Sequence, residues 1–79
     1  MKIDPSVFED YLHDLGVLIR EIAVEAKSKA EAGGRNDFEV GYMAAFHRVV
    51  SLMQQQAEAF NLPLEKIALD NLDPDEELV

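Results

Sequence analysis

The residues best suited to metal or acid–base chemistry are the two histidines. Glu9 and Asp10 precede His13 by four and three positions, so on a helix either carboxylate shares a face with the imidazole. Di-metal four-helix bundles use two Glu-x-x-His motifs of this kind plus two further carboxylates, all directed inward. His47 has Ala44 three residues before it, so the second motif is missing. We therefore expect no metal site and no cofactor.

Other catalytic signatures are also missing from the sequence. Its three serines, Ser6, Ser28 and Ser51, lie in no glycine elbow, and it has no glycine-rich phosphate loop and no H-E-x-x-H motif. Without cysteine, the chain has no thiolate nucleophile, disulfide or thiolate zinc site. Residues 70–77 are acidic but lack the glycine and the distal glutamate of a calcium loop. We expect a protein that is not an enzyme.

The charge of the chain is strongly negative, with seven basic and sixteen acidic residues and a net charge of −9. Nucleic acids and anionic membranes bind clustered lysine and arginine, so neither is an expected partner. The acidity is concentrated near the C-terminal end, at Asp70, Asp73, Asp75, Glu76 and Glu77. Residues 70–79 are predicted to form an acidic tail, which either only solvates the chain or docks a basic partner protein.

The location of the protein is predicted from its apolar segments. The first residues, Met-Lys-Ile-Asp-Pro, contain no apolar core of a signal peptide. No apolar run approaches the roughly 20 residues that span a bilayer. We expect a cytoplasmic protein without membrane contact.

A first long helix is predicted between two strong boundary signals. Asp4 suits the capping position and Pro5 the first helical position. Apolar residues then recur every three or four positions, which is the period of a helix and not of a strand. Gly33 and Gly34 end the helix, because glycine readily adopts the left-handed conformation of a helix cap.

A second long helix begins after Asn36, which with Glu39 resembles a capping box. Its pattern runs from Phe38 to Phe60, and a short third helix is predicted from Pro63 to about Ala68. The predicted fold class is therefore all-α: an antiparallel helical hairpin with a short third C-terminal helix. Residues 1–69 are predicted to form the hairpin domain, ahead of the acidic tail.

The first helix has two kinds of apolar residue on neighbouring sides. Large side chains form the centre of its stripe: Phe8, Leu15 and Ile22. Small residues follow one flank at heptad spacing: Gly16, Ala23 and Ala30. Glycine inside a helix costs about 1 kcal/mol relative to alanine, so Gly16 suggests that another element approaches closely.

The second helix has an apolar face that covers about half of its circumference. Contact with the first helix alone requires a stripe of only about 100°, so a second neighbour is expected. Since a chain of 79 residues without disulfides has a small core, we expect a homodimer that forms a four-helix bundle. The predicted interface consists of Phe38, Tyr42, Phe46, Val49, Val50, Met53, Gln56 and Phe60. Gln56 would meet its own copy near the two-fold axis.

The sequence identifies no specific biological role. The favoured interpretation is a small, acidic, non-enzymatic interaction module that homodimerises and presents an acidic surface, with a basic protein as a candidate further partner. The alternative is an antitoxin-like, immunity-like or nucleic-acid-mimicking inhibitor of a basic partner. Such a mimic needs acids spread over a folded face, whereas most of the excess acid here lies in residues 65–79, which favours the first interpretation.

Overall fold

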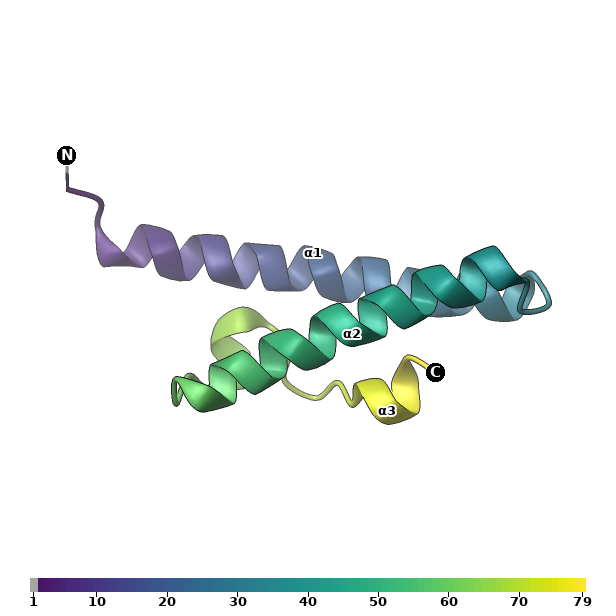
Figure 1. The fold of residues 1–79 in the computed structure, drawn as a ribbon. Helices are drawn as coiled ribbons and strands as arrows, with labels where there is room; N and C mark the ends of the chain where they lie inside the picture. The colour runs from purple at the N-terminus through teal and green to yellow at the C-terminus, as the bar shows by residue number, and fades with distance from the viewer. Residues whose placement is uncertain (1) are drawn as a thin grey trace.

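Two long antiparallel helices and a returning C-terminal segment make up the fold (Figure 1). The computed structural model describes residues 2–79, and Met1, the first residue of the predicted hairpin domain, lies outside them. The helices are α1 (Pro5–Ala32), α2 (Asp37–Ala59), the 3₁₀ helix η1 (Leu64–Ile67) and α3 (Pro74–Glu77). Within residues 2–79 there is no strand. The all-α hairpin and its short C-terminal helix are confirmed.

Side-chain caps fix where the two long helices begin. The Asp4 carboxylate accepts the backbone N–H of Ser6 at 2.9 Å, and this hydrogen bond lowers the pKa of Asp4. Asn36 Oδ1 accepts the N–H of Glu39 at 3.0 Å, as the capping pattern predicts. Between the helices the chain turns through Gly34 and Arg35, whose φ angles are 72° and 60°. The helix boundaries therefore follow local sequence signals.

The small flank of α1 is buried in this structure, and its large apolar stripe is not. Ala23 and Ala30 are fully buried, whereas Phe8 and Ile22 are 56% and 39% exposed. Phe8 and Ile22, which the sequence places at the centre of the apolar stripe of this helix, therefore lie largely in solvent and not in the core. Close contact with α2 and with the C-terminal segment requires small side chains, and α1 turns that flank inward.

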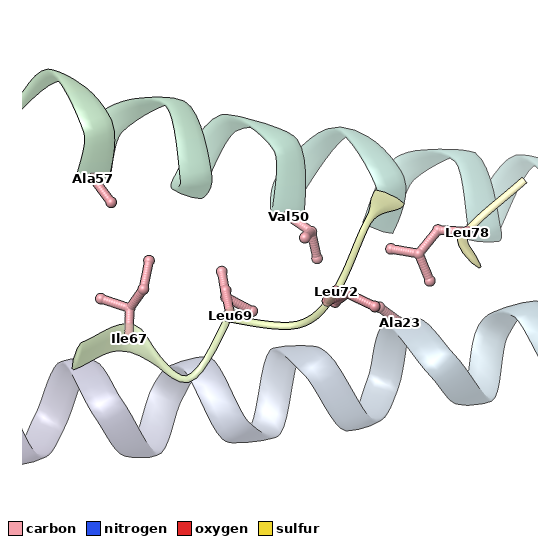
Figure 2. Packing of buried hydrophobic residues seen from close by; sticks show 7 residues of the cluster. All are labelled: Ala23, Val50, Ala57, Ile67, Leu69, Leu72 and Leu78. Atoms are coloured by element: carbon pink, nitrogen blue, oxygen red, sulfur yellow. The ribbon is translucent and has the colours of Figure 1, made fainter. Parts of the chain in front are cut away.

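The C-terminal segment, residues 64–79 from η1 to the last residue, packs between the two long helices (Figure 2). Leu69 and Leu78 are almost completely buried, and Leu72 is only 8% exposed. Residues 70–79, expected to form an acidic tail, thus share one core with the hairpin. Val50 also lies in this core and is fully buried, so its assignment to a dimer interface is wrong.

Polar side chains hold the non-helical part of this segment. The Arg20 guanidinium donates hydrogen bonds to the carbonyl oxygens of Ala68 and Asp70 at 3.1 and 2.6 Å. The Gln54 amide donates to the carbonyl oxygens of Leu69 and Leu72 at 3.1 and 2.8 Å. Because the backbone here forms no regular ladder, these bonds satisfy carbonyl groups that burial would leave unpaired.

Gly16 provides the first test of this packing. A Cβ atom at Gly16 would overlap the backbone carbonyl of Ile67, which cannot rotate away. We expect Gly16→Ala to lower the free energy of unfolding by about 1–3 kcal/mol, as overpacked cores do. Gly41→Ala is the matched control, since nothing lies within 4 Å of a Cβ atom there. Urea unfolding of Gly41→Ala should show a gain of about 0.5–1 kcal/mol. Equal effects at both positions would contradict the close approach.

Leu78 tests whether the C-terminal segment belongs to the core. Leu78→Ala should lower the free energy of unfolding by about 2–5 kcal/mol, because the side chain is 1% exposed. Val79→Ala, at a neighbour that is half exposed, should change it by no more than about 0.5 kcal/mol. Thermal and urea melts of both variants measure the difference. An unchanged melt for Leu78→Ala would show that residues 70–79 are a tail outside the core.

Candidate functional site

The C-terminal segment covers only one side of the hairpin. On α1, Arg20 hydrogen-bonds to it, and Lys27, seven residues later, contacts the carbonyl oxygen of Val79. On α2, His47 and Gln54, also seven residues apart, bind it. Residues seven apart lie on nearly the same side of a helix, so each helix turns one polar side to the segment.

The opposite side of α1 is apolar and exposed. Ala23 marks the buried direction of the helix, and Lys27, four residues later, marks the side of the C-terminal segment. Ile22 and Ile19, one and four positions before Ala23, lie on the other flank. This flank carries exposed large side chains: Phe8, Tyr11, Leu18 and Ile22.

α2 repeats this arrangement with reversed chain direction. Val50 marks its buried direction, Gln54 marks the side of the C-terminal segment, and Val49 lies on the other flank. The flank is an uncharged stripe of seven residues: Phe38, Tyr42, Phe46, Val49, Met53, Gln56 and Phe60. Because both helices face the segment with one side, their opposite flanks lie together. We call the combined surface of these seven residues with Phe8, Tyr11, Leu18 and Ile22 the open face.

The predicted interface residues lie on the open face, apart from Val50. Phe38 and Phe60 are 79% and 78% exposed, the highest values among the large apolar side chains. Tyr42 and Val49 are also exposed, as is Gln56. The two remaining residues, Phe46 and Met53, are half-buried and pack against the core.

The contribution of α1 to the open face was missed by the sequence reasoning. Tyr11 and Leu18 are 64% and 55% exposed, although both belong to the apolar pattern that recurs every three or four positions of this helix. The small-residue flank carried the signal that could have corrected this. If Ala23 and Ala30 face inward, the large residues beside them turn toward solvent.

Aromatic rings line one end of the open face. The rings of Phe38 and Tyr42 stack with centroids 6.3 Å apart and planes at 15°. Tyr42 and Phe46 meet at 5.1 Å and 59°. Both arrangements are favourable for aromatic pairs, so this end of α2 presents an ordered apolar surface.

An apolar pocket opens at the other end of the face. Its volume is about 240 Å³, and its lining residues come from α1, from the C-terminal end of α2 and from the chain that continues into η1. The residues that line it are Leu12, Met53, Gln56, Ala57, Phe60, Leu62 and Ile67. Gln56 is its one polar residue, so the chemistry of the pocket suits a hydrocarbon or aromatic group.

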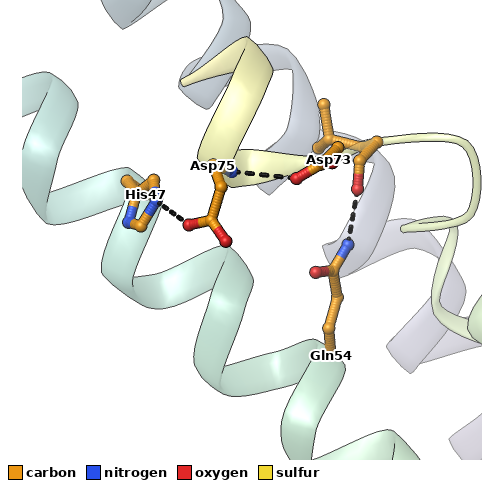
Figure 3. Close-up of polar contacts among 5 residues, drawn as sticks. His47, Gln54, Asp73 and Asp75 are labelled. Atoms are coloured by element: carbon orange, nitrogen blue, oxygen red, sulfur yellow. Dashed lines mark hydrogen bonds and ion pairs between the residues drawn. The ribbon is translucent and has the colours of Figure 1, made fainter. Parts of the chain in front are cut away.

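The acidic residues of the C-terminal segment are largely occupied by local contacts (Figure 3). Asp73 accepts the N–H of Asp75 at 3.0 Å and so caps α3, and Glu77 accepts the N–H of Asp73 at 2.6 Å. Asp75 forms a 3.0 Å contact with His47. The Asp70 carboxylate accepts a hydrogen bond from the neighbouring asparagine at 3.3 Å, and Glu76 is exposed. The main role of these acids is thus to stabilise the conformation of the segment.

The candidate metal ligands of α1 lie on an exposed surface. Glu9, Asp10 and His13 line an open depression together with Glu65 and Lys66 of η1. Among residues 2–79, no three histidine or acidic side chains are grouped so that they could hold a metal ion. Lys66 adds a positive charge that would oppose a bound cation.

Comparison with known proteins adds no family assignment, because no family model, curated protein or solved structure matches this chain. Within residues 2–79, neither long helix is apolar enough over a sufficient length to cross a membrane. The open face is therefore the feature from which a function is inferred.

Zinc tests the exposed ligands of α1. We expect micromolar zinc to leave the melting temperature unchanged, because a ligand that prefers the native state must raise it. Differential scanning fluorimetry with and without a chelator measures this, and His13→Ala is the control. Saturable stabilisation that disappears in His13→Ala would establish a metal site.

Proposed function

We propose that this protein is a non-enzymatic interaction module that works as a cytoplasmic homodimer, with two open faces packed together in a four-helix bundle. The open face is the observation that carries the proposal. Soluble monomers rarely expose contiguous apolar patches of more than a few hundred Å². The chain measures 49 × 23 Å in its two longer dimensions, which leaves room for the roughly 800 Å² that each partner buries in a standard interface.

A second copy suits the open face better than a charged partner does. None of the seven residues of the α2 stripe is charged, so the stripe offers no group that could pair with a basic or acidic surface. Two-fold symmetry is the commonest arrangement for a self-complementary patch. Dimerisation would also enlarge a core in which α1 contributes only glycine and alanine as fully buried residues.

In such a dimer the C-terminal segments face outward. Each would present exposed acids such as Asp73, Asp75 and Glu76 beside a depression of about 540 Å³ that Glu58 also lines. With a net charge of −9 per chain, the assembled surface favours a basic protein partner. An inhibitor of a basic partner is the alternative, and it has less support because a mimic needs acids spread over a folded face, whereas most of the excess acid here lies in residues 65–79.

Val49 tests the proposed interface. Sedimentation equilibrium at micromolar concentration should give twice the chain mass of 8.9 kDa. Val49→Asp should produce a folded monomer, because a carboxylate near the centre of the apolar contact loses its hydration without gaining a partner. Val24→Asp is the matched control, since Val24 is similarly exposed but lies on α1 away from the open face.

Two outcomes would contradict the proposal. A wild-type protein that stays monomeric with a cooperative melt would show that the open face is not a dimer interface. Equal dissociation by Val24→Asp and Val49→Asp would show that charge alone, and not the open face, controls association.

A further inference from the structure

The two most exposed large apolar side chains among residues 2–79 lie at opposite ends of the α2 stripe. Phe38 and Phe60 are 22 residues apart, which is about 33 Å along a helix. Phe38 is the terminal ring of the aromatic stack, and its ring centroid lies 6.3 Å from that of Tyr42. Phe60 lines the apolar pocket. One end of the open face thus carries a protruding ring, and the other end is hollow.

We propose that the two copies of the dimer stack with their hairpins reversed, so that Phe38 of each copy enters the pocket beside Phe60 of the other. This inference rests on the proposed homodimer and specifies its geometry. It also identifies the occupant of the pocket as an aromatic side chain of a second copy of this chain.

The residue spacing of α2 supports this arrangement. Val49 is the midpoint of the stripe, with Phe38 eleven residues before it and Phe60 eleven residues after it. A two-fold axis that passes near Val49 and reverses the helix direction therefore brings Phe38 over Phe60. The same operation brings Tyr42 over Gln56, since these lie seven residues before and after Val49.

The pocket has the size and chemistry for a phenyl ring. Its volume is about 240 Å³, and an apolar cavity of roughly 150 Å³ is enough to hold benzene. Its floor and walls come from both helices and η1, through residues such as Leu12, Ala57 and Ile67. A ring placed there would exchange water contact for apolar contact on the sides that the pocket lines.

Gln56 gains a hydrogen-bond partner in the reversed arrangement. When a second copy covers the open face, the amide of Gln56 loses water and needs a polar group. The Tyr42 hydroxyl of the other copy can donate to the amide oxygen or accept from the amide nitrogen. The pairing of Gln56 with its own copy, expected from the sequence, requires either a reversed dimer whose axis passes at Gln56, which moves Phe38 away from the pocket, or helices that run in the same direction. The second arrangement places pocket over pocket and leaves both without an aromatic ring.

Crosslinking distinguishes the two arrangements, and it is clean because the chain has no cysteine. Tyr42→Cys and Gln56→Cys are made as single variants, and sedimentation shows whether each is dimeric. In the reversed dimer, each introduced thiol lies about 21 Å from its own copy, beyond the reach of a short bismaleimide. The mixed variants should therefore crosslink, whereas neither should crosslink alone. Val49→Cys, near the axis, should crosslink alone and is the positive control.

The other possible results contradict either the geometry of the dimer or the dimer itself. Crosslinking of Tyr42→Cys or Gln56→Cys alone would show helices running in the same direction or an axis displaced from Val49, and either result would overturn this inference. A dimer in which the mixture fails to crosslink would also overturn it. A monomeric wild type would instead overturn the proposed function. If Tyr42→Cys is monomeric, Ala45→Cys mixed with Met53→Cys repeats the test four residues to either side of Val49.

Phe38→Ala tests the occupant of the pocket. We expect the dimer dissociation constant to rise about 30-fold, the scale of an aromatic residue that anchors an interface. Val24→Ala, outside the open face, should leave it unchanged. A Phe38→Ala dimer as tight as the wild type would overturn the assignment of Phe38 to the pocket.

Discussion

The C-terminal segment packs between α1 and α2, and this contact determines which sides of both helices remain exposed. Leu69, Leu72 and Leu78 fill the space between the helices, while Arg20 and Gln54 bind the backbone carbonyl groups of the segment. Both helices must therefore turn one polar side toward it. The opposite flanks, with their large apolar side chains, are left in solvent as a consequence.

A close backbone approach makes this packing possible. The carbonyl group of Ile67 lies against α1 at Gly16, in space that a Cβ atom would occupy. Ala23 and Ala30 continue the same small flank toward the turn. The core gained in this way is modest, because the buried residues of α1 are glycine and alanine. The apolar residues that could enlarge it lie on the open face, which is why we infer that a second copy completes the fold.

The charges of the protein are divided between structure and surface. Arg20 and Lys27, two of its seven basic residues, bind the C-terminal segment. Asp73 and Glu77 form the hydrogen bonds at the start of α3. The strong negative charge therefore does not lie on a detached tail, and a basic partner would meet it on an ordered surface beside α2.

Local signals in the sequence determined the helices of this protein. Asp4 and Asn36 cap them, and the glycines at positions 33 and 34 separate them, because capping and turn formation depend on a few neighbouring residues. The exposure of Phe38 and Phe60 also followed from the width of the apolar pattern on the second helix.

Only the tertiary structure decided which side of each helix faces inward. Periodicity shows that a helix has an apolar side, but α1 has a large-residue side and a small-residue side next to each other, and the choice between them depends on a segment 50 residues away. The burial of Leu72 and Leu78 had no local signal, because two leucines in an acidic stretch show no period. Val50 was assigned to the interface because Leu69, which lies in the same core, is distant in sequence and leaves no local signal beside it. Long-range packing, which no local pattern records, divided the apolar residues between the core and the open face.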